Sequence, residues 1–320
     1  MLDPESLYLA QSGALENQRL HNLPLVISLS HPVDAGGTAG LLSEVLLKEL
    51  KNVPIVEFDA DQLHDYRARR PRIRYVKDHF EDPVLPMLKL YAVEDRLGKP
   101  FLLLAGAEPD LQWQRFIEAF VQLTQRLEVS VALSVSGFPM PVPHTRPFPV
   151  TAHGSRKDLL KGISGWRPVA EMSGSLSALL EVALADVGIG TAGFGINVPQ
   201  YLAEAELPQS SLLAMEHLSI AAKLSLPTDQ LIDASDAAMK QINEQVEMNP
   251  EISTMISRLE ESYDFNIKNV ESQMLSLAER EEGNLPDRDE LGAVIEDYLA
   301  HMDQNPDDGG SESEDRQIDS

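Results

Sequence analysis

The side chains best placed for chemistry lie in one proline-rich loop, Ser136 to Pro147, which carries His144 and Arg146. An apolar, strand-like run from Val129 to Val135 leads into this loop. Four prolines within a dozen residues remove backbone donors and fix φ, so they predict that the strand stops where the loop begins. Open α/β sheets bind ligands beyond the carboxyl ends of their strands, which makes this loop a candidate recognition site. The alternative is a connecting loop whose polar tips only face water.

A second candidate is the turn from Asp34 to Thr38, between a strand-like run, Pro24 to Leu29, and a helical pattern that continues to Leu50. Gly36 and Gly37 permit unusual φ angles there, and free backbone N–H groups at such a turn could hold an anion. Helix capping alone is the simpler interpretation of these residues.

A basic cluster stands out in a chain that is otherwise acidic. It begins after Asp65 and contains Arg67, Arg69, Arg70, Arg72, Arg74 and Lys77. Guanidinium groups suit bidentate contacts with carboxylate or phosphate, so the cluster is a candidate anion site or an inter-subunit salt-bridge surface. The alternative is pairing within the molecule with Asp59, Asp61, Asp65 and Asp78.

Two carboxylates, Glu108 and Asp110, follow the apolar run from Phe101 to Ala105. Either could serve as a general acid or base at a strand end, although two carboxylates beside a proline are a weak signal. Asp110 is also predicted to be the N-cap of a helix that continues to Leu127.

The remaining elements predict an α/β fold followed by helices. Further strands are expected at 53–58, 85–93, 149–152 and 168–172. Gly188 to Gly193 matches the dinucleotide-binding pattern G-x-G-x-x-G, but a helix is predicted before it and a strand after it, which is the wrong order for that motif. Beyond Leu207 only helices are predicted, at 210–225, 228–246, 250–280 and 287–302, and the acidic end from Asp303 is expected to be disordered.

The totals exclude several classes of function. The net charge is −25 in 320 residues, which argues against general binding to nucleic acid or to an anionic membrane surface. There is no cysteine, no signal peptide pattern, and no apolar run near the roughly 20 residues of a membrane span, so a cytoplasmic protein is expected. Histidines at metal-ligand spacing and the common hydrolase motifs are absent, so we expect no metal and no cofactor, and a non-enzymatic role is favoured over an enzyme.

Five short motifs in order carry a family resemblance: Asp34-Ala-Gly-Gly-Thr38, Asp65-Tyr-Arg-Ala-Arg-Arg-Pro71, Gly106-Ala-Glu-Pro-Asp-Leu-Gln-Trp113, Pro141-Val-Pro-His-Thr-Arg-Pro147 and Val198-Pro-Gln-Tyr-Leu202. With them the chain resembles the PAC2 family of proteasome assembly chaperone-like proteins, in an actinobacterial form. The resemblance implies a three-layer αβα core, related to phosphorylase and hydrolase folds, in residues 1–226. A helical extension would then occupy 227–303 and an acidic tail 304–320.

Two functions follow as hypotheses. The resemblance implies a homo-oligomeric, non-enzymatic assembly chaperone or scaffold that binds a protein partner or client complex. The alternative is a phosphorylase-like or hydrolase-like enzyme, or a small-anion binder, that uses a crevice at the carboxyl edge of the sheet. The candidate ligand or interface residues for either function are Asp34, Gly36, Gly37, Asp65, Arg67, Arg69, Arg70, Glu108, Asp110, His144 and Arg146.

Overall fold

The computed structural model describes residues 3–163, 171 and 173–281. The chain divides into two compact units, Met1–Ile267 and Lys268–Ser320. The described part of the second unit is the continuation of helix α8 (Pro250–Glu281), which begins in the first unit. The first unit contains the sheet and every candidate site residue.

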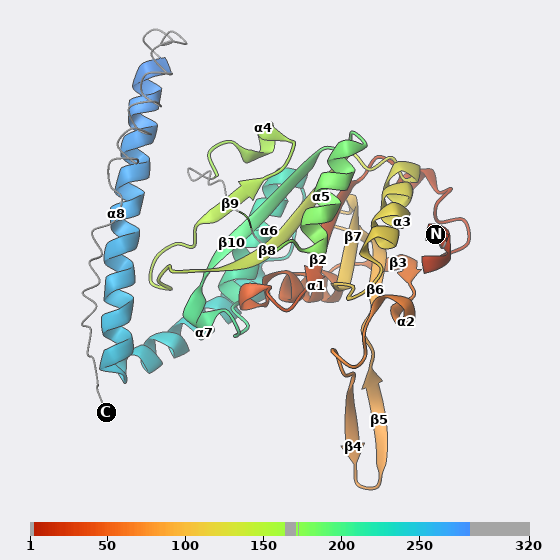
Figure 1. Cartoon of the computed structure of the whole chain (residues 1–320), viewed down its shortest axis with the longest axis horizontal. Helices are drawn as coiled ribbons and strands as arrows, with labels where there is room; N and C mark the ends of the chain where they lie inside the picture. Colours follow the sequence, from red (N-terminus) through yellow and green to blue (C-terminus); the bar gives the residue numbers. More distant parts are fainter. Residues whose placement is uncertain (1–2, 164–170, 172, 282–320) are drawn as a thin grey trace, which may run out of the picture. The chain divides into compact units, whose positions relative to one another are not determined.

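The first unit is built on a mixed eight-stranded sheet in the order β1-β3-β6-β7-β2-β8-β10-β9 (Figure 1). Its strands are β1 (Tyr8–Ala10), β2 (Pro24–Ser30), β3 (Asn52–Phe58), β6 (Leu88–Glu94), β7 (Pro100–Ala107), β8 (Val131–Met140), β9 (Val150–His153) and β10 (Thr191–Pro199). The central strands β7, β2, β8 and β10 are parallel, and the pairs on both flanks are antiparallel. The carboxyl ends of the four central strands therefore lie along one edge of the sheet.

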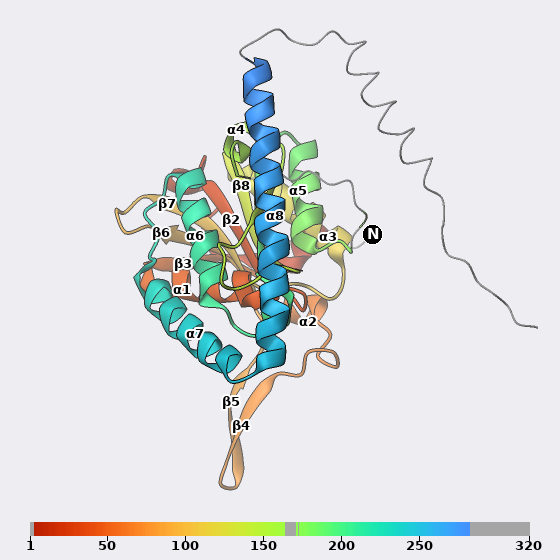
Figure 2. The same cartoon turned by 90° about the vertical axis from the view of Figure 1, so that its left-hand side faces the viewer.

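Helices cover both faces of the sheet, as its nearly continuous apolar strands require. One face carries α3 (Trp113–Arg126) and α5 (Leu176–Asp186), and the other carries α1 (Thr38–Glu49) and α6 (Pro208–Ala222) (Figures 1 and 2). In β2 the buried side chains alternate, with Leu25 and Ile27 in one core and Val26 in the other. This arrangement confirms the three-layer α/β core.

A helical region follows the sheet. Helix α7 (Asp229–Glu247) packs along α6 and contributes Leu231 to the core beneath it, and α8 follows. The three helices confirm the helices predicted at 210–225, 228–246 and 250–280. The helix predicted at 287–302 and the acidic end lie outside the described residues, as does most of the strand predicted at 168–172.

The structure corrects two predictions near the candidate site. Strand β8 does not stop at Val135 but runs to Met140, because beyond Ser134 it pairs with β10 alone. A strand with one unpaired edge tolerates Pro139, since proline lacks only the N–H donor. Asp110 is not the N-cap of α3. That position is occupied by Gln112, whose side chain makes no capping hydrogen bond.

The basic cluster forms a structure that the sequence patterns did not predict. Residues Arg72–Val76 (β4) and His79–Val84 (β5) pair as an antiparallel hairpin that forms its own two-stranded sheet. Figures 1 and 2 both show this hairpin standing away from the body, below the short helix α2 (Ala60–Leu63). The remaining short helix, α4 (Lys157–Leu160), follows β9.

Candidate functional site

Most candidate residues follow the carboxyl ends of β2, β7 and β8, whereas Asp65, Arg67, Arg69 and Arg70 follow the short helix α2, and the polar contacts of the candidates fall into separate groups. Asp34 and its two glycines follow β2. Glu108 and Asp110 follow β7, and Asp110 joins Asp65 and Arg69 at the root of the hairpin. His144 and Arg146 lie in the loop between β8 and β9.

Asp34 joins the ends of two central strands. Its Oδ2 accepts hydrogen bonds from Ala39 N (2.9 Å) and Gly40 N (3.2 Å) in the first turn of α1, and its Oδ1 accepts one from Gly137 N (3.0 Å) in β8. Burial raises the pKa of this carboxyl above its usual value, although the three N–H donors act in the opposite direction. A side chain at Gly137 would place its Cβ 2.0 Å from the Ala35 carbonyl oxygen. The junction therefore requires glycine opposite Asp34.

The amides of Gly36 and Gly37 are already used within the fold. Gly36 N donates to Ala203 O (2.8 Å) and Gly37 N donates to Asp34 O (3.0 Å). Gly36 has φ of +71°, and a Cβ there would meet Ser210 Oγ at 2.9 Å. The turn is therefore built for close packing against α6, and these two amides offer no donor to an anion.

Asp110 links the strand edge to the root of the hairpin. Its Oδ1 lies 3.0 Å from Arg69 Nε, and its Oδ2 accepts from Asp65 N (3.0 Å). His64 is 3% exposed, and among the described residues neither of its ring nitrogens has a hydrogen-bond partner. Its Nδ1 lies 3.8 Å from Asp110 Oδ2, which is too far for a hydrogen bond. Burial lowers the pKa of His64.

The other members of the basic cluster differ from Arg69 in their ion pairs. Arg74 pairs with Glu81 and Asp82 across the hairpin. Within the described residues no ion pair is formed by Arg67, Arg70, Arg72 or Lys77. The acidic partners thus differ from those that the sequence suggested, and much of the basic charge stays available on the surface.

Glu108 caps a helix on the neighbouring layer. It is buried, and its Oε1 accepts a 2.6 Å hydrogen bond from Leu176 N, the first residue of α5. A carboxylate at a helix N-terminus is stabilised by the unpaired amides there. Glu108 therefore holds α5 against the end of β7.

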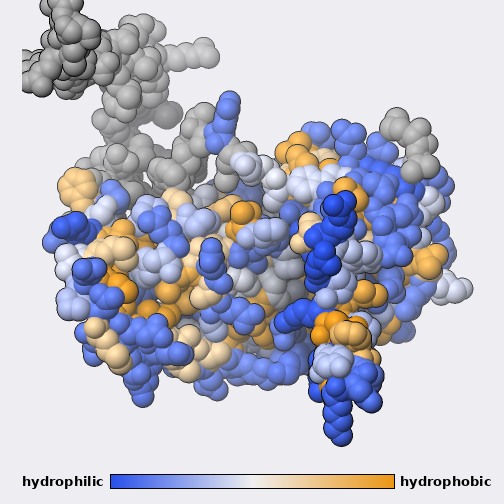
Figure 3. All heavy atoms as spheres, turned by 60° about the horizontal axis from the view of Figure 1, so that its bottom comes forward, coloured by the Kyte–Doolittle hydropathy of each residue, from blue (hydrophilic) through white to orange (hydrophobic). Residues whose placement is uncertain are grey.

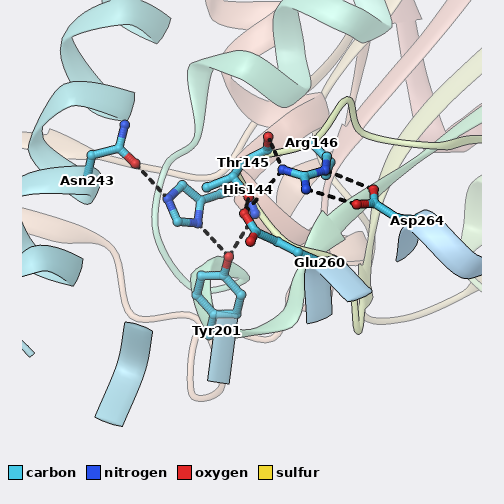
Figure 4. Close-up of polar contacts among 7 residues, drawn as sticks. All are labelled: His144, Thr145, Arg146, Tyr201, Asn243, Glu260 and Asp264. Carbon is cyan, nitrogen blue, oxygen red and sulfur yellow. Dashed lines mark hydrogen bonds and ion pairs between the residues drawn. The ribbon is translucent and has the colours of Figure 1, made fainter. Parts of the chain in front are cut away.

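His144 is enclosed by protein groups on both sides of its ring (Figure 4). The Tyr201 hydroxyl accepts from His144 N (2.8 Å) and lies 2.7 Å from Nδ1, and Nε2 lies 3.0 Å from Asn243 Oδ1 in α7. A hydroxyl that donates to Nδ1 and an Nε2–H that donates to Asn243 Oδ1 satisfy both ring nitrogens of His144. Burial also raises the pKa of Tyr201. The imidazole thus connects the β8–β9 loop to α7.

Arg146 makes the corresponding connection to α8 (Figure 4). Its Nε and Nη2 donate to the two carboxylate oxygens of Asp264 (2.9 and 3.0 Å), and its Nη1 lies 3.2 Å from Glu260 Oε1. Tyr263 adds a hydrogen bond from its hydroxyl to Pro147 O (2.7 Å). The hydrogen bonds that the guanidinium donates to Asp264 raise the pKa of Arg146 further. The polar tips of the loop are therefore bonded to the helical region and are not presented to solvent as a free pair.

No contact that the structure shows joins these groups into one catalytic arrangement. Likewise, nowhere in residues 3–163, 171 and 173–281 do three acidic or histidine side chains gather as metal ligands would. Nor does any helix in those ranges combine the length and apolarity that a bilayer span needs. The candidate residues instead form hydrogen bonds and ion pairs that connect the sheet, the root of the hairpin and the helices.

Comparison with known proteins identifies the family. The PAC2 family pattern matches residues 29–246. The chain belongs to the PAC2 family. No match is found among proteins with curated descriptions.

Several solved structures share this fold. A Mycobacterium tuberculosis protein of unknown function, Rv2714, is 35% identical, with a TM-score of 0.79 over 86% of this chain and 94% of that one. A Corynebacterium glutamicum protein of unknown function is 32% identical, with a TM-score of 0.78 over 82% and 98%. A proteasome-assembly chaperone homologue of M. tuberculosis, Rv2125, is 22% identical, with a TM-score of 0.65 over 73% and 100%, and shows the fold alone.

The sequence patterns did not predict the residues that His144 and Arg146 contact from the β8–β9 loop. Tyr201, Asn243, Glu260 and Asp264 lie 57 to 118 residues beyond the side chains that they contact. Only Tyr201 carried a signal, since it lies in the Val198 to Leu202 motif. The other three belong to helices in which their polar side chains match an ordinary solvated face.

The hairpin of this PAC2 protein carries the exposed apolar residues that the patterns also missed. Tyr75 and Phe80 pair across the strands with ring centroids 5.1 Å apart, and both are about two-thirds exposed. Ile73, two residues before Tyr75 in β4, is exposed as well, and we call Ile73, Tyr75 and Phe80 together the hairpin face. Val84, Leu85 and Met87 are exposed where the chain returns to the body. Figure 3 shows hydrophobic side chains where the hairpin leaves the body and hydrophilic ones toward its tip.

Proposed function

We propose that this PAC2-family protein is a non-enzymatic assembly chaperone or scaffold that works as a homo-oligomer and holds a protein partner. The observation that carries the proposal is the hairpin face, which stays in solvent in the single chain. Ile73 is 51% exposed, Tyr75 64% and Phe80 66%. A protein contact is the ordinary explanation for such a patch.

Hairpin energetics support an interface. A two-stranded hairpin is marginally stable in water, because its two strands bury little surface against each other. Large aromatic side chains stabilise an interface most when they are buried in a pocket of the partner. The β4–β5 hairpin would therefore be ordered more firmly by a partner than by the body of its own chain.

The basic residues that precede the hairpin suit a partner with an acidic surface. Residues 67–84, which comprise the hairpin and the segment before it, contain six basic residues and three acidic ones, in a chain of net charge −25. Opposite charges at the rim of an interface steer association and fix its register. Another copy of this acidic chain offers such a surface, which supports the homo-oligomer.

The relatives support the chaperone part of the proposal. One neighbour in fold is described as a proteasome-assembly chaperone homologue. Another, PbaB of Pyrococcus furiosus, is described as an archaeal proteasome activator and is 14% identical, with a TM-score of 0.54. Both descriptions refer to the proteasome, a large protein complex. A client of that kind is what we propose for this chain.

Light scattering on the full chain tests the proposal. We expect the wild-type protein to be an oligomer and the double variant Tyr75→Ser/Phe80→Ser to be a folded monomer with unchanged circular dichroism. Leu97→Ser is the matched control, because Leu97 is 84% exposed in another turn and should not affect assembly. A wild-type monomer, or a double variant that assembles normally, contradicts the proposal.

Affinity capture tests the client. The wild-type chain and the Leu97→Ser control should retain the same proteins from a lysate of the source cells, identified by mass spectrometry. If the oligomer forms but retains no protein above the level of an unrelated acidic control, the chaperone part of the proposal is wrong.

A further inference from the structure

Helix α5 leaves an apolar side in solvent. Leu176, Leu180 and Leu184 are fully buried against the sheet, as the inner side of a surface helix should be. The exposed residues of α5 are, with one exception, apolar: Ala178, Leu179, Val182 and Asp186. Leu179 is 41% exposed and Val182 is 60% exposed. The outer side of α5 therefore lacks the polar residues that the solvated side of a helix carries.

Two other helices show what the outer side of a helix carries in this protein. Every exposed residue of α3 is polar: Gln114, Glu118, Gln122, Gln125 and Arg126. Helix α6, on the opposite face of the sheet, is as rich in apolar residues as α5, but α7 packs along it, and Leu231 and Ile242 of α7 join the core there. Among the described helices α5 packs chiefly beside α3, and its outer side has no cover comparable to α7. Helix α5 thus has the composition of a helix that a further helix covers.

A groove with an apolar floor lies between α3 and α5, which Figure 1 shows side by side in front of the sheet. Its apolar lining comes from Ile117 and Val121 of α3 and from Ala183 and Val187 at the end of α5. Leu179 lies one turn before Ala183, so it extends the apolar surface along α5. The volume of the groove is about 340 Å³. A cavity of about 150 Å³ already holds a benzene molecule, so the groove has room for large apolar side chains.

The rim of the groove is acidic. Glu118 of α3 and Asp186 of α5 line it, and within the described residues neither forms an ion pair. Asp186 lies in the last turn of α5, where backbone carbonyl groups already carry partial negative charge, and that turn contains no basic residue. The last turn of α3, in contrast, contains Arg126. A cation from a partner is therefore favoured at this end of the groove both by Asp186 and by the helix terminus.

The floor and the rim together specify the chemistry of the occupant. Amphipathic helices bind such grooves by placing apolar side chains at positions i, i+3, i+4 and i+7 on the floor. Basic residues beside those positions match Glu118 and Asp186 at the rim. The helical region of this chain does not match, because α7 and α8 together contain twelve acidic residues and four basic ones. The occupant that fits is therefore a helix of another protein.

We propose that the α3–α5 groove binds an amphipathic, basic helix of the client protein. The apolar side of that helix packs on Val121, Val182 and Val187, and its lysine or arginine side chains lie beside Glu118 and Asp186. This proposal rests on the chaperone function proposed above and names the surface that holds the client. The groove lies apart from the β4–β5 hairpin (Figures 1 and 2), so the two surfaces share no residue.

A synthetic peptide tests the chemistry of the groove. The probe is a fluorescein-labelled helix of about 18 residues, with leucine on one side and lysine on the other. Fluorescence anisotropy should show that it binds the wild-type chain and that Val182→Lys weakens binding by about tenfold or more. Ile220→Lys is the matched control, since Ile220 is 76% exposed on α6, on the other face of the sheet, and should leave the affinity unchanged. A peptide that does not bind, or that binds both variants equally, overturns the proposal.

Neutralising the rim separates local from general attraction. Glu118→Gln/Asp186→Asn should weaken peptide binding by about tenfold. Glu44→Gln/Glu216→Gln removes as much charge from exposed residues of α1 and α6, on the other face of the sheet, and should have little effect. If the two double variants weaken binding equally, the peptide responds to the net charge of −25 and not to the groove, which contradicts the proposal.

Site-specific cross-linking identifies the natural occupant. Benzoylphenylalanine, a photoreactive residue, in place of Val182 of the full chain should cross-link in the source cells to a client segment with the pattern of a basic amphipathic helix, as mapped by mass spectrometry. A cross-link to a second copy of this chain, or to a client segment without that pattern, overturns the proposal. If Val182→Lys retains the client of the previous subsection as fully as the wild-type chain does, the groove is not the client site, although the proposed function stands. If the wild-type chain retains no client, both proposals fail.

Discussion

At the scale of single residues, the side chains that look catalytic in the sequence serve mainly as structural ties. Asp34, Glu108 and His144 each use their polar atoms on groups from a different element. The sequence predicts their position at the carboxyl edge, because a strand pattern is readable locally. It cannot predict their partners, because those lie tens of residues away and are selected by packing. Burial turns these contacts from optional into necessary, since an unpaired buried polar group is costly.

Replacing Asp34 by asparagine should destabilise the fold by about 1–3 kcal/mol. Both carboxylate oxygens accept backbone N–H groups, whereas an asparagine must point its NH₂ at one of those donors. Urea unfolding monitored by circular dichroism measures the change. Asp236→Asn, on the exposed side of α7, is the control and should be neutral. Equal stability of the two variants would show that the hydrogen bonds of Asp34 do not stabilise the fold.

The lowered pKa of Asp95 predicts that the stability of the fold depends on pH. Burial alone would raise its pKa, but hydrogen bonds from the backbone N–H groups of Ser225, Lys99 and Leu97 lower it. A lowered pKa in the folded state contributes stability above the unfolded value of about 3.9, and this contribution is lost as the pH falls through the folded value. The stability difference between wild type and Asp95→Ala should therefore be constant above about pH 5 and shrink below about pH 4. Denaturant titrations across that range measure it, and a difference that grows toward acid pH would contradict the assignment.

At the scale of elements, the helices and central strands could be read from the sequence because their apolar periods are regular. The β4–β5 hairpin could not, since Arg72 to Val84 mixes arginine, aromatic and acidic residues with a proline and matches no buried strand pattern. Strand β8 was predicted too short for a related reason. Proline signals the end of a strand that is paired on both sides, and β8 is paired on one side only where Pro139 lies.

The stability of the first turns of α8 against local unfolding should depend on Arg146. Removing this side chain leaves Asp264 without its bidentate partner and removes a charge beside Glu260. We expect Arg146→Ala to speed amide hydrogen exchange in residues 256–266 by about tenfold, which corresponds to roughly 1.4 kcal/mol of local opening free energy. Arg146→Lys should be intermediate, because lysine keeps the charge and loses the fork geometry.

Arg258→Ala is the control for that experiment. Arg258 is exposed on the same helix and forms no ion pair within the described residues. If Arg258→Ala speeds the exchange as much as Arg146→Ala does, the effect comes from helix propensity and not from the contact with the loop.

At the scale of the whole molecule, the core residues that the structure describes all precede Lys268. Removing residues 268–320 should therefore leave the first unit folded, with a melting temperature within a few degrees of that of the full chain. Differential scanning calorimetry measures this, and loss of the cooperative transition would contradict it. The sequence could predict a change to helices after Leu207, but it could not show that the early turns of α8 are bonded to the core unit through Arg146.

The order of the strands has a kinetic consequence. The parallel centre pairs β2 with β7 and β8, whose partner residues lie far along the chain, as in Leu25 with Leu102 and with Ala132, which are 77 and 107 positions away. Such distant pairings close slowly, on a scale of milliseconds to seconds, whereas an antiparallel hairpin closes in about 1–10 μs. A folding chain will therefore expose the aromatic side chains of its hairpin face long before its central sheet is complete. Aggregation during refolding should accordingly rise with concentration and fall when Tyr75 and Phe80 are replaced by serine.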